Sequence, residues 1–235
     1  MAKQAKKRNV AAKSKTKAKA KTKSKAQAKQ PKVHLYGVWL SQPTQRVALM
    51  LNMAKVPHAY HHVDLFQGEH KKPDYLKINR FGQVPALVCK GEAMCQSNRI
   101  LEFLAASTGK FDGGSPKDKR AVREWLNWCD DRLVNVNRAR AQIRFQKGGP
   151  EIVAFCQANA RAALDVLEAH MKGRKFIVGA KPTIADIAAY AQIALLDEAQ
   201  LDIKTWPSIA EWCARVAKLP GSSHPYEALP KESRA

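Results

Sequence analysis

Apolar positions between residues 33 and 108 switch repeatedly between the two-residue period of strands and the spacing of amphipathic helices. Val33 to Tyr36 alternates as a strand does. Pro43 then suits the first turn of a helix, because its missing N–H costs nothing there. The Lys90-Gly91 pair between two short runs predicts a hairpin. The predicted strand, helix, strand, helix, hairpin and helix cover residues 33–36, 43–54, 59–65, a piece that ends near 78, 86–95 and 97–108.

The resulting order, β-α-β-α-β-β-α, is that of a thioredoxin-like domain. After a linker rich in glycine and proline, apolar residues recur only at helical spacing, with long helices over 152–171 and 206–219. The predicted fold class is therefore α/β plus all-α, with a helical bundle as the C-terminal domain. The predicted boundaries are a basic tail at 1–32, the thioredoxin-like domain at 33–109, the linker at 110–117, the helical domain at 118–221 and a C-terminal extension at 222–235.

Positive charge is concentrated at the N-terminus. The 235 residues include 41 Lys+Arg and 20 Asp+Glu, for a formal net charge of +21, and residues 1–32 hold 13 of the basic residues and no acidic one. With almost no large apolar side chain, this tail is expected to be disordered and extended by self-repulsion. Such a polycation can contact nucleic acid or another polyanion in a salt-dependent manner, without sequence preference. The alternative is a leader that only aids solubility.

Composition excludes two other classes of protein. No stretch approaches the roughly 20 apolar residues needed to cross a bilayer, so membrane insertion is not expected. The five cysteines are scattered and form no CxxC pair, which predicts free thiols in a reducing, cytoplasmic setting. No histidine or carboxylate partners repeat at the spacing of metal ligands, and no metal site is predicted.

Three segments, in this order, resemble the glutathione S-transferase family: Leu-Tyr-Gly-Val-Trp-Leu-Ser-Gln-Pro at 35–43, Gly-Gln-Val-Pro-Ala-Leu at 82–87, and Gln96-Ser97. The Leu-Ser-Gln-Pro string is most similar to the theta-type branch, which uses a serine. The resemblance covers about residues 33–220. It implies a cytoplasmic, homodimeric detoxification enzyme without a permanently bound cofactor. Such an enzyme transfers glutathione, its co-substrate, to an alkyl or aryl electrophile.

Ser41 is the residue that this resemblance places at the reacting sulfur. Glutathione reacts as its thiolate, and a free cysteine thiol titrates near about 8.5. Ser41 lies between the first strand and the first helix, where its hydroxyl and the helix N-terminus can face a bound sulfur. One charge-assisted hydrogen bond of roughly 1.5–3 kcal/mol is large enough to lower the thiol pKa by one or two units. Two alternatives stay open: Ser41 as an ordinary helix cap, and Tyr36 as the rival hydroxyl.

The resemblance assigns five positions to the tripeptide and its loop. Val84 would hold the cysteinyl portion through its backbone. In the family the proline that matches Pro85 is cis, which turns the backbone of the preceding residue toward the tripeptide. Ser97, at the start of a helix, would bind the γ-glutamyl carboxylate. His70 and Gln83 match positions that reach the glycyl carboxylate.

Gln96 departs from the pattern, since the resembled proteins usually carry an acidic residue there that pairs with the substrate ammonium. We therefore expect weaker glutathione binding or a modified thiol substrate. Together with the tail, Gln96 also motivates an alternative function. The chain would then be a non-catalytic transferase-like module that its tail tethers to nucleic acid or another polyanion.

Two features of the helical part complete the prediction. Thr183 and Asp186 have the spacing of a helix-capping box, which serves folding rather than chemistry. Arg140 and Arg144 share a helical face at i, i+4, where they would attract an acidic second substrate. The alternative for these arginines is a basic, solvated face without a ligand.

Overall fold

The computed structural model describes residues 32–146 and 148–230. The predicted basic tail therefore lies, apart from Lys32, outside the described residues. So do the last five residues of the C-terminal extension.

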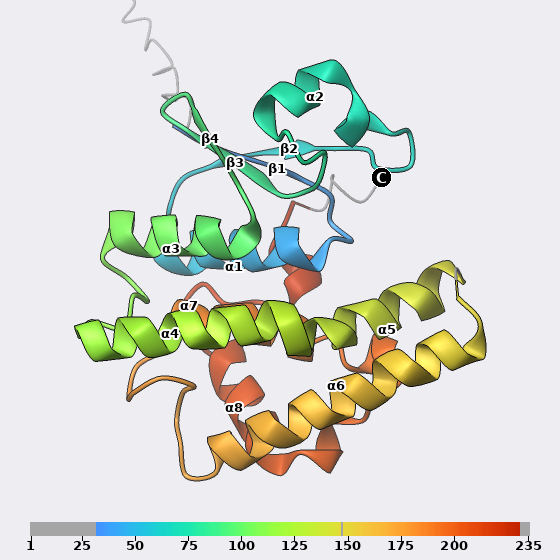
Figure 1. Ribbon diagram of the computed structural model, residues 1–235. Coiled ribbons are helices and arrows are strands. Elements are labelled where there is room, and N and C mark those ends of the chain that lie inside the picture. Colours follow the sequence, from blue (N-terminus) through green and yellow to red (C-terminus); the bar gives the residue numbers. More distant parts are fainter. Residues whose placement is uncertain (1–31, 147, 231–235) are drawn as a thin grey trace, which may run out of the picture. The chain divides into compact units, whose positions relative to one another are not determined.

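Four strands and three helices form the first half of the described chain. β1 runs parallel to β2 and antiparallel to β3, in a sheet of order β2-β1-β3-β4. In Figure 1, α1 and α3 lie against one face of this sheet and α2 lies on the other side. This arrangement confirms the predicted thioredoxin-like domain. The elements are β1 (Val33–Gly37), α1 (Gln42–Ala54), β2 (Ala59–His62), α2 (Pro73–Ile78), β3 (Ala86–Cys89), β4 (Glu92–Cys95) and α3 (Ser97–Thr108).

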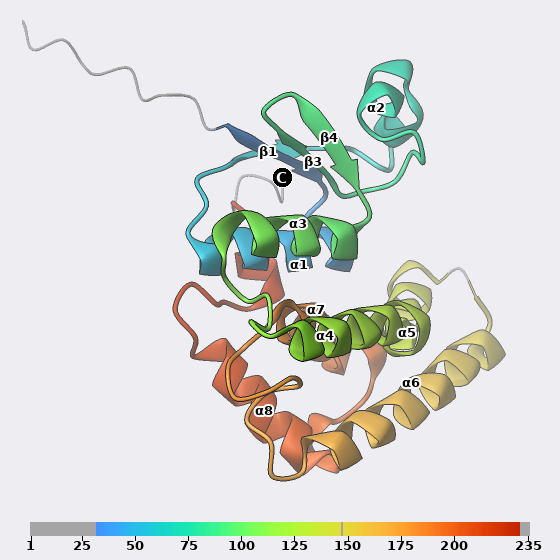
Figure 2. The ribbon, with the colours of Figure 1, turned by 60° about the vertical axis from the view of Figure 1, so that its left-hand side comes forward.

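The second half is helical, as predicted. Figure 2 shows α4, α7 and α5 below α1 and α3, with α6 and α8 farther from the sheet. α7 is buried along its whole length, because it packs against α1, α3, α4, α5 and α8. The helical half consists of α4 (Pro116–Trp128), a π-helical turn (Cys129–Leu133), α5 (Val134–Phe145), α6 (Pro150–Met171), α7 (Ile184–Ile193) and α8 (Pro207–Ala217), with 3-10 turns at Asp197–Ala199 and Ile203–Thr205.

α1 joins the two halves. It contacts β1 and α3 on one side and α7 on the other, and of its 13 residues only Pro43 and Asn52 are not buried. The start of the helix is pressed against β1, since a Cβ atom at Gly37 would stand 2.3 Å from Cγ2 of Thr44. Only glycine fits there. The N-terminus of α1, with Ser41 before it, is therefore held in place by both halves of the fold.

The C-terminal extension packs back on the thioredoxin-like half. A 3-10 turn (Pro225–Glu227) leads to Ala228, whose carbonyl accepts a hydrogen bond from Nδ2 of Asn52 at 2.9 Å. Gly221 passes so close that a Cβ atom there would lie 2.7 Å from the Asn52 carbonyl oxygen. The sequence predicted an extension at this position but no packing.

Several element boundaries differ from those expected, including the start of α6 at Pro150 and the end of α8 at Ala217, and two others bear on the site and the linker. β2 ends at His62, three residues early. α4 begins at Pro116, inside the predicted linker, because the Ser115 hydroxyl caps the helix by accepting a hydrogen bond from the Asp118 N–H at 3.1 Å. Of the helices in the described ranges, none has the length and apolar character needed to cross a membrane.

Candidate active site

Two adjoining pockets bring the predicted site residues together. The Ser41 pocket, of about 610 Å³, lies between the start of α1 and the end of α5. The Ser97 pocket, of about 510 Å³, lies between the β3 approach, the start of α3 and the π-helical turn. Both are lined by Pro43, Leu65 and His70, so the two pockets adjoin at these three residues. Of the remaining predicted residues, Arg140 and Arg144 line the Ser41 pocket, whereas Gln83, Val84, Pro85 and Gln96 line the Ser97 pocket.

Ser41 caps α1 and lines its pocket at the same time. Its backbone is extended, and its hydroxyl oxygen accepts a hydrogen bond from the Thr44 N–H at 3.3 Å. A hydroxyl accepts with its lone pairs and still carries one hydrogen to donate. Capping and donation to a sulfur anion are therefore compatible roles for this residue.

Tyr36 belongs to another part of the molecule. Its ring stacks on His61 with centroids 4.5 Å apart, and His61 Nε2 lies 2.9 Å from Nδ1 of His34. Burial and the neighbouring His34 lower the pKa of His61. Tyr36 lines neither pocket, so Ser41 is the one of the two candidate hydroxyls that faces the site.

The loop before β3 presents its backbone to the Ser97 pocket. The Val84–Pro85 peptide bond is cis. The Gln83 carbonyl accepts hydrogen bonds from the Tyr75 hydroxyl at 2.7 Å and from Nδ2 of Asn79 at 2.6 Å. Burial raises the pKa of Tyr75 to about 12, which keeps its hydroxyl a donor. These two anchors from α2 and its end fix the position of the loop.

Gln96 stands at the start of α3 with φ at 68° and ψ at 113°, a backbone conformation that non-glycine residues rarely adopt. Its Nε2 donates to Oε1 of Gln83 at 3.4 Å across the pocket. Ser97 follows as the first residue of α3 and is 8% exposed. The unpaired N–H groups of this helix start favour an anion at the Ser97 pocket.

His70 lines both pockets from a 3-10 turn (Glu69–Lys71). Its Nδ1 is buried and has no hydrogen-bond partner within the described ranges.

Comparison with known proteins identifies the family. The glutathione S-transferase N-terminal domain matches residues 41–107, and the C-terminal domain of the same family matches residues 138–215. Glutathione S-transferase 3 of Zea mays is 30% identical over 210 residues, which are 83% of this chain and 94% of the maize protein. The chain belongs to the glutathione S-transferase family.

Solved glutathione transferases share the fold. The crystal structure of a glutathione S-transferase from Pseudomonas fluorescens matches with a TM-score of 0.77 and 28% identity, over 83% of this chain and 98% of that chain. A glutathione transferase of Phanerochaete chrysosporium, solved in complex with oxidized glutathione, has a TM-score of 0.77 and 21% identity over 84% of this chain and 96% of that chain. Enzymes of the family use glutathione as a co-substrate, and membership supports glutathione transferase activity.

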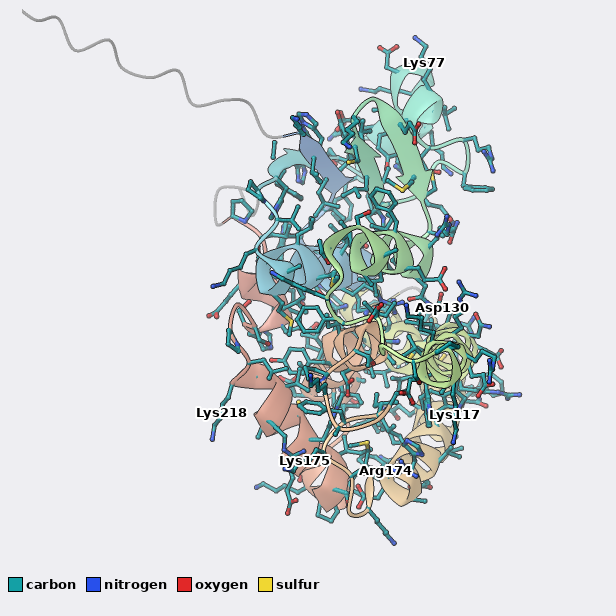
Figure 3. All side chains as sticks on the ribbon, turned by 90° about the vertical axis from the view of Figure 1, so that its left-hand side faces the viewer. Lys77, Lys117, Asp130, Arg174, Lys175 and Lys218 are labelled. Carbon is teal, nitrogen blue, oxygen red and sulfur yellow. The ribbon has the colours of Figure 1, made fainter. Side chains whose placement is uncertain are left out.

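Asp130 is a pocket-lining carboxylate that no sequence pattern had indicated. It lies in the π-helical turn and lines the Ser97 pocket, between α3 and the helical layer (Figure 3). Arg46, itself 2% exposed, donates to Oδ1 of Asp130 at 2.9 Å, and Asn98 donates to Oδ2 at 2.8 Å. Asp130 follows Ser97 by 33 positions in an acidic stretch that resembles any solvated helix face. No local pattern would have placed it here.

Arg140 does not lie on a solvated face, which corrects that alternative. It is 4% exposed, and its guanidinium donates to Glu198 at 2.6 Å, to Asn137 at 3.0 Å, to the Leu40 carbonyl at 3.2 Å and to the Tyr226 hydroxyl at 2.8 Å. Four of its five N–H groups therefore have protein acceptors. The bond to Leu40 fixes the residue before Ser41.

Arg144, one turn farther along α5, is different. Its side chain is 40% exposed, and the nearest carboxylate oxygen, Oε2 of Glu198, is 3.7 Å away. Burial raises the pKa of Glu198, but hydrogen bonds from Tyr226 and Arg140 outweigh it and hold that pKa below its usual range. Glu198 is thus ionised near neutral pH and offsets one of the two guanidinium charges.

The Thr183–Asp186 box is present and lies away from both pockets. The Asp186 carboxylate accepts from the Thr183 N–H at 2.8 Å, and the Thr183 hydroxyl accepts from the Ala185 N–H at 3.3 Å. Asp186 also accepts from the Ile177 N–H and from Nε1 of Trp212, both at 2.9 Å. It joins three segments of the helical half.

Proposed function

We propose that the chain is a serine-type glutathione transferase of the theta-like branch, in which the Ser41 hydroxyl donates to the glutathione sulfur and stabilises its thiolate. The observation that carries this proposal is the position of Ser41. It lines a pocket at the start of a buried helix, whereas Tyr36 stacks on His61 outside both pockets. The helix N-terminus adds a positive partial charge that favours the same anion.

The tripeptide would occupy the Ser97 pocket. The Val84 backbone would pair with the cysteinyl residue, in the manner of an added strand. Ser97 and the start of α3 would bind the γ-glutamyl carboxylate. His70 and Gln83 would hold the glycyl carboxylate at the other end.

Asp130 would supply the negative charge that Gln96 lacks. Each of its oxygens accepts one hydrogen bond from the protein, and a carboxylate has about four acceptor sites. Two sites therefore remain for the γ-glutamyl ammonium. On this proposal, the neutral Gln96 does not by itself weaken glutathione binding.

The thiolate would attack an electrophilic carbon in the Ser41 pocket, where it displaces a leaving group or adds to a double bond. Each unit by which the thiol pKa falls requires about 1.4 kcal/mol of preference for the anion. A hydrogen bond from Ser41 to charged sulfur, worth roughly 1.5–3 kcal/mol, meets that requirement for one or two units. Detoxification in the cytoplasm as a homodimer, with the domain division predicted above, is part of this proposal.

The test replaces each candidate hydroxyl. Ser41→Ala should reduce turnover with glutathione and an activated aryl or alkyl halide at least tenfold. The variant loses the hydrogen bond to the thiolate, and each 1.4 kcal/mol or so of lost stabilisation slows the reaction about tenfold. The thiol pKa of bound glutathione, measured from thiolate absorbance, should rise by at least one unit. Tyr36→Phe is the matched control and should leave both values unchanged. Full activity in Ser41→Ala with loss in Tyr36→Phe would contradict the assignment.

A further inference from the structure

Two exposed aromatic side chains stand among the residues that line the Ser41 pocket. Phe66, on the loop after β2, is 74% exposed, and Phe145, at the end of α5, is 40% exposed. Their ring centroids are 6.1 Å apart with an interplanar angle of 60°, a favourable tilted pair. Exposed large aromatic surface beside a pocket is typical of a ligand-binding face.

The same pocket carries an excess of positive charge. Arg140 and Arg144 line it, and no Asp or Glu is among its described lining residues. Glu198, just behind the two arginines, offsets one guanidinium. Arg140 is engaged by four protein acceptors, so the accessible cation is Arg144.

We propose that the second substrate is a planar aromatic electrophile that carries an anionic group, with its ring on the Phe66–Phe145 pair and its anion on Arg144. The proposal rests on the transferase function proposed above, and it names the class of electrophile that this site selects.

The spacing of the residues sets the shape of this substrate. Arg140 bonds to Leu40, the neighbour of Ser41, and Arg144 lies four residues on, about 6 Å along the helix. A single benzene ring spans a similar distance between para substituents. The reacting carbon can therefore face the sulfur at Ser41 while a carboxylate on the opposite ring carbon meets Arg144.

A matched substrate pair tests this selection. With 4-chloro-3,5-dinitrobenzoate, the glutathione thiolate forms a C–S bond at C4, and chloride leaves with the electrons of the C–Cl bond. The corresponding benzamide undergoes the same reaction without the negative charge. With kcat/KM divided by the uncatalysed rate for each compound, the benzoate should be favoured about three- to tenfold, the range for a half-exposed charge pair.

Substitutions locate the selection. Arg144→Gln should remove the preference for the benzoate, which is read as the ratio of the two corrected kcat/KM values so that any loss common to both compounds cancels. Arg138→Gln is the matched control, because Arg138 is an exposed arginine of the same helix that does not line the pocket. Phe66→Ala should lower kcat/KM for both compounds several-fold. Phe81→Ala should not, because Phe81 is an aromatic residue, 47% exposed, that lies outside both pockets.

A binding measurement without glutathione separates this proposal from the transferase function. The full-length chain is titrated with 3,5-dinitrobenzoate, which has no leaving group, and with its amide. Tighter binding of the benzoate that Arg144→Gln abolishes and Arg138→Gln preserves would support the anion site even if no conjugation occurred. Equal binding of acid and amide, or equal losses in both arginine variants, would overturn it, since the overall basic charge would then explain any attraction.

Discussion

Asp186 accepts four hydrogen bonds, two on each carboxylate oxygen. Oδ2 accepts from the N–H and the hydroxyl of Thr183, and Oδ1 accepts from Ile177 and Trp212. The residue is fully buried. It therefore ties the start of α7 to the preceding loop and to α8, well beyond the cap that its spacing predicted.

Asp186→Asn should destabilise the fold without touching the site. Whichever way the amide is turned, its NH2 group faces two donors, and leaving buried donors unpaired costs about 2–4 kcal/mol in the free energy of unfolding. Urea unfolding measures this loss. Asp202→Asn, at an exposed carboxylate that caps a 3-10 turn by accepting from the Lys204 N–H, should cost less than about 1 kcal/mol. Equal losses in the two variants would contradict the role given to Asp186.

Single residues differ in how far local sequence could predict them. Ser41 follows a strand and precedes a proline-marked helix, so its cap position was readable from its neighbours. Arg46 was not singled out, because its partner Asp130 is 84 positions away and belongs to the other half of the fold. An ion pair between a buried arginine and an exposed aspartate of another element leaves no periodic signal in the chain.

At the scale of elements, the C-terminal extension and α5 together hold the turn that carries Ser41. Arg140 of α5 donates both to the Leu40 carbonyl and to the Tyr226 hydroxyl, and Tyr226 lies in the 3-10 turn of the extension. The ring of Tyr226 also packs against Trp39 of the same turn, with centroids 5.4 Å apart. Three segments that are distant in sequence thus fix one backbone carbonyl next to the candidate catalytic residue.

Tyr226→Phe should loosen this turn through Arg140. Because the Ser41 hydroxyl would be less well aimed, the pKa of bound glutathione thiol should rise by about half a unit to one unit, which corresponds to roughly 0.7–1.4 kcal/mol. Thiolate absorbance against pH measures it. Tyr190→Phe is the control, since Tyr190 bonds to the Ser223 carbonyl at 3.2 Å in the same extension without reaching Arg140. An unchanged thiol pKa in Tyr226→Phe would leave Tyr226 a purely structural role.

The contact between α5 and the turn at Asp197–Ala199 should depend on pH through Glu198. Its pKa is held below the ordinary value of 4.5, so it contributes stability that is present above that value and is lost as the pH falls through the folded pKa. Urea unfolding from pH 7 to pH 3 should show this loss in the unaltered chain. Glu198→Gln should be less stable at pH 7, and its free energy of unfolding should fall less steeply as the pH is lowered. Glu211→Gln, at an exposed glutamate of α8, should lose stability with falling pH as the unaltered chain does.

For the whole molecule, local patterns predicted the order of elements and several of their ends, including both strands of the β3–β4 hairpin. They did not predict how the halves meet. The π-helical turn that brings Asp130 to the Ser97 pocket, and the return of the extension onto α1, are set by contacts across the fold rather than by periodicity. The i, i+4 spacing of Arg140 and Arg144 predicted that they share a helical face, but it did not show that Arg140 is held by Glu198 and Leu40 while Arg144 is half-exposed.

The charge of the whole chain leads to the last prediction. Deleting residues 1–31 removes 12 lysines and arginines and lowers the net charge from +21 to +9. Lys32 is kept because its carbonyl accepts a hydrogen bond from the Lys90 N–H at 3.3 Å. Retention of the truncated protein on immobilised DNA or heparin should weaken sharply. For DNA, the slope of the logarithm of the binding constant against the logarithm of the salt concentration falls in magnitude by about 0.9 for every phosphate that the chain no longer neutralises.

Transferase kinetics should stay within about twofold in the truncated chain, because it keeps every described residue that lines the two pockets. If the shortened chain binds the polyanion as strongly, and with the same salt dependence, as the full-length chain, the contact lies on the folded body. Loss of retention together with unchanged conjugation would instead assign the two properties to separate parts of the chain. The tail would then determine where the enzyme resides, while the two pockets determine what it conjugates.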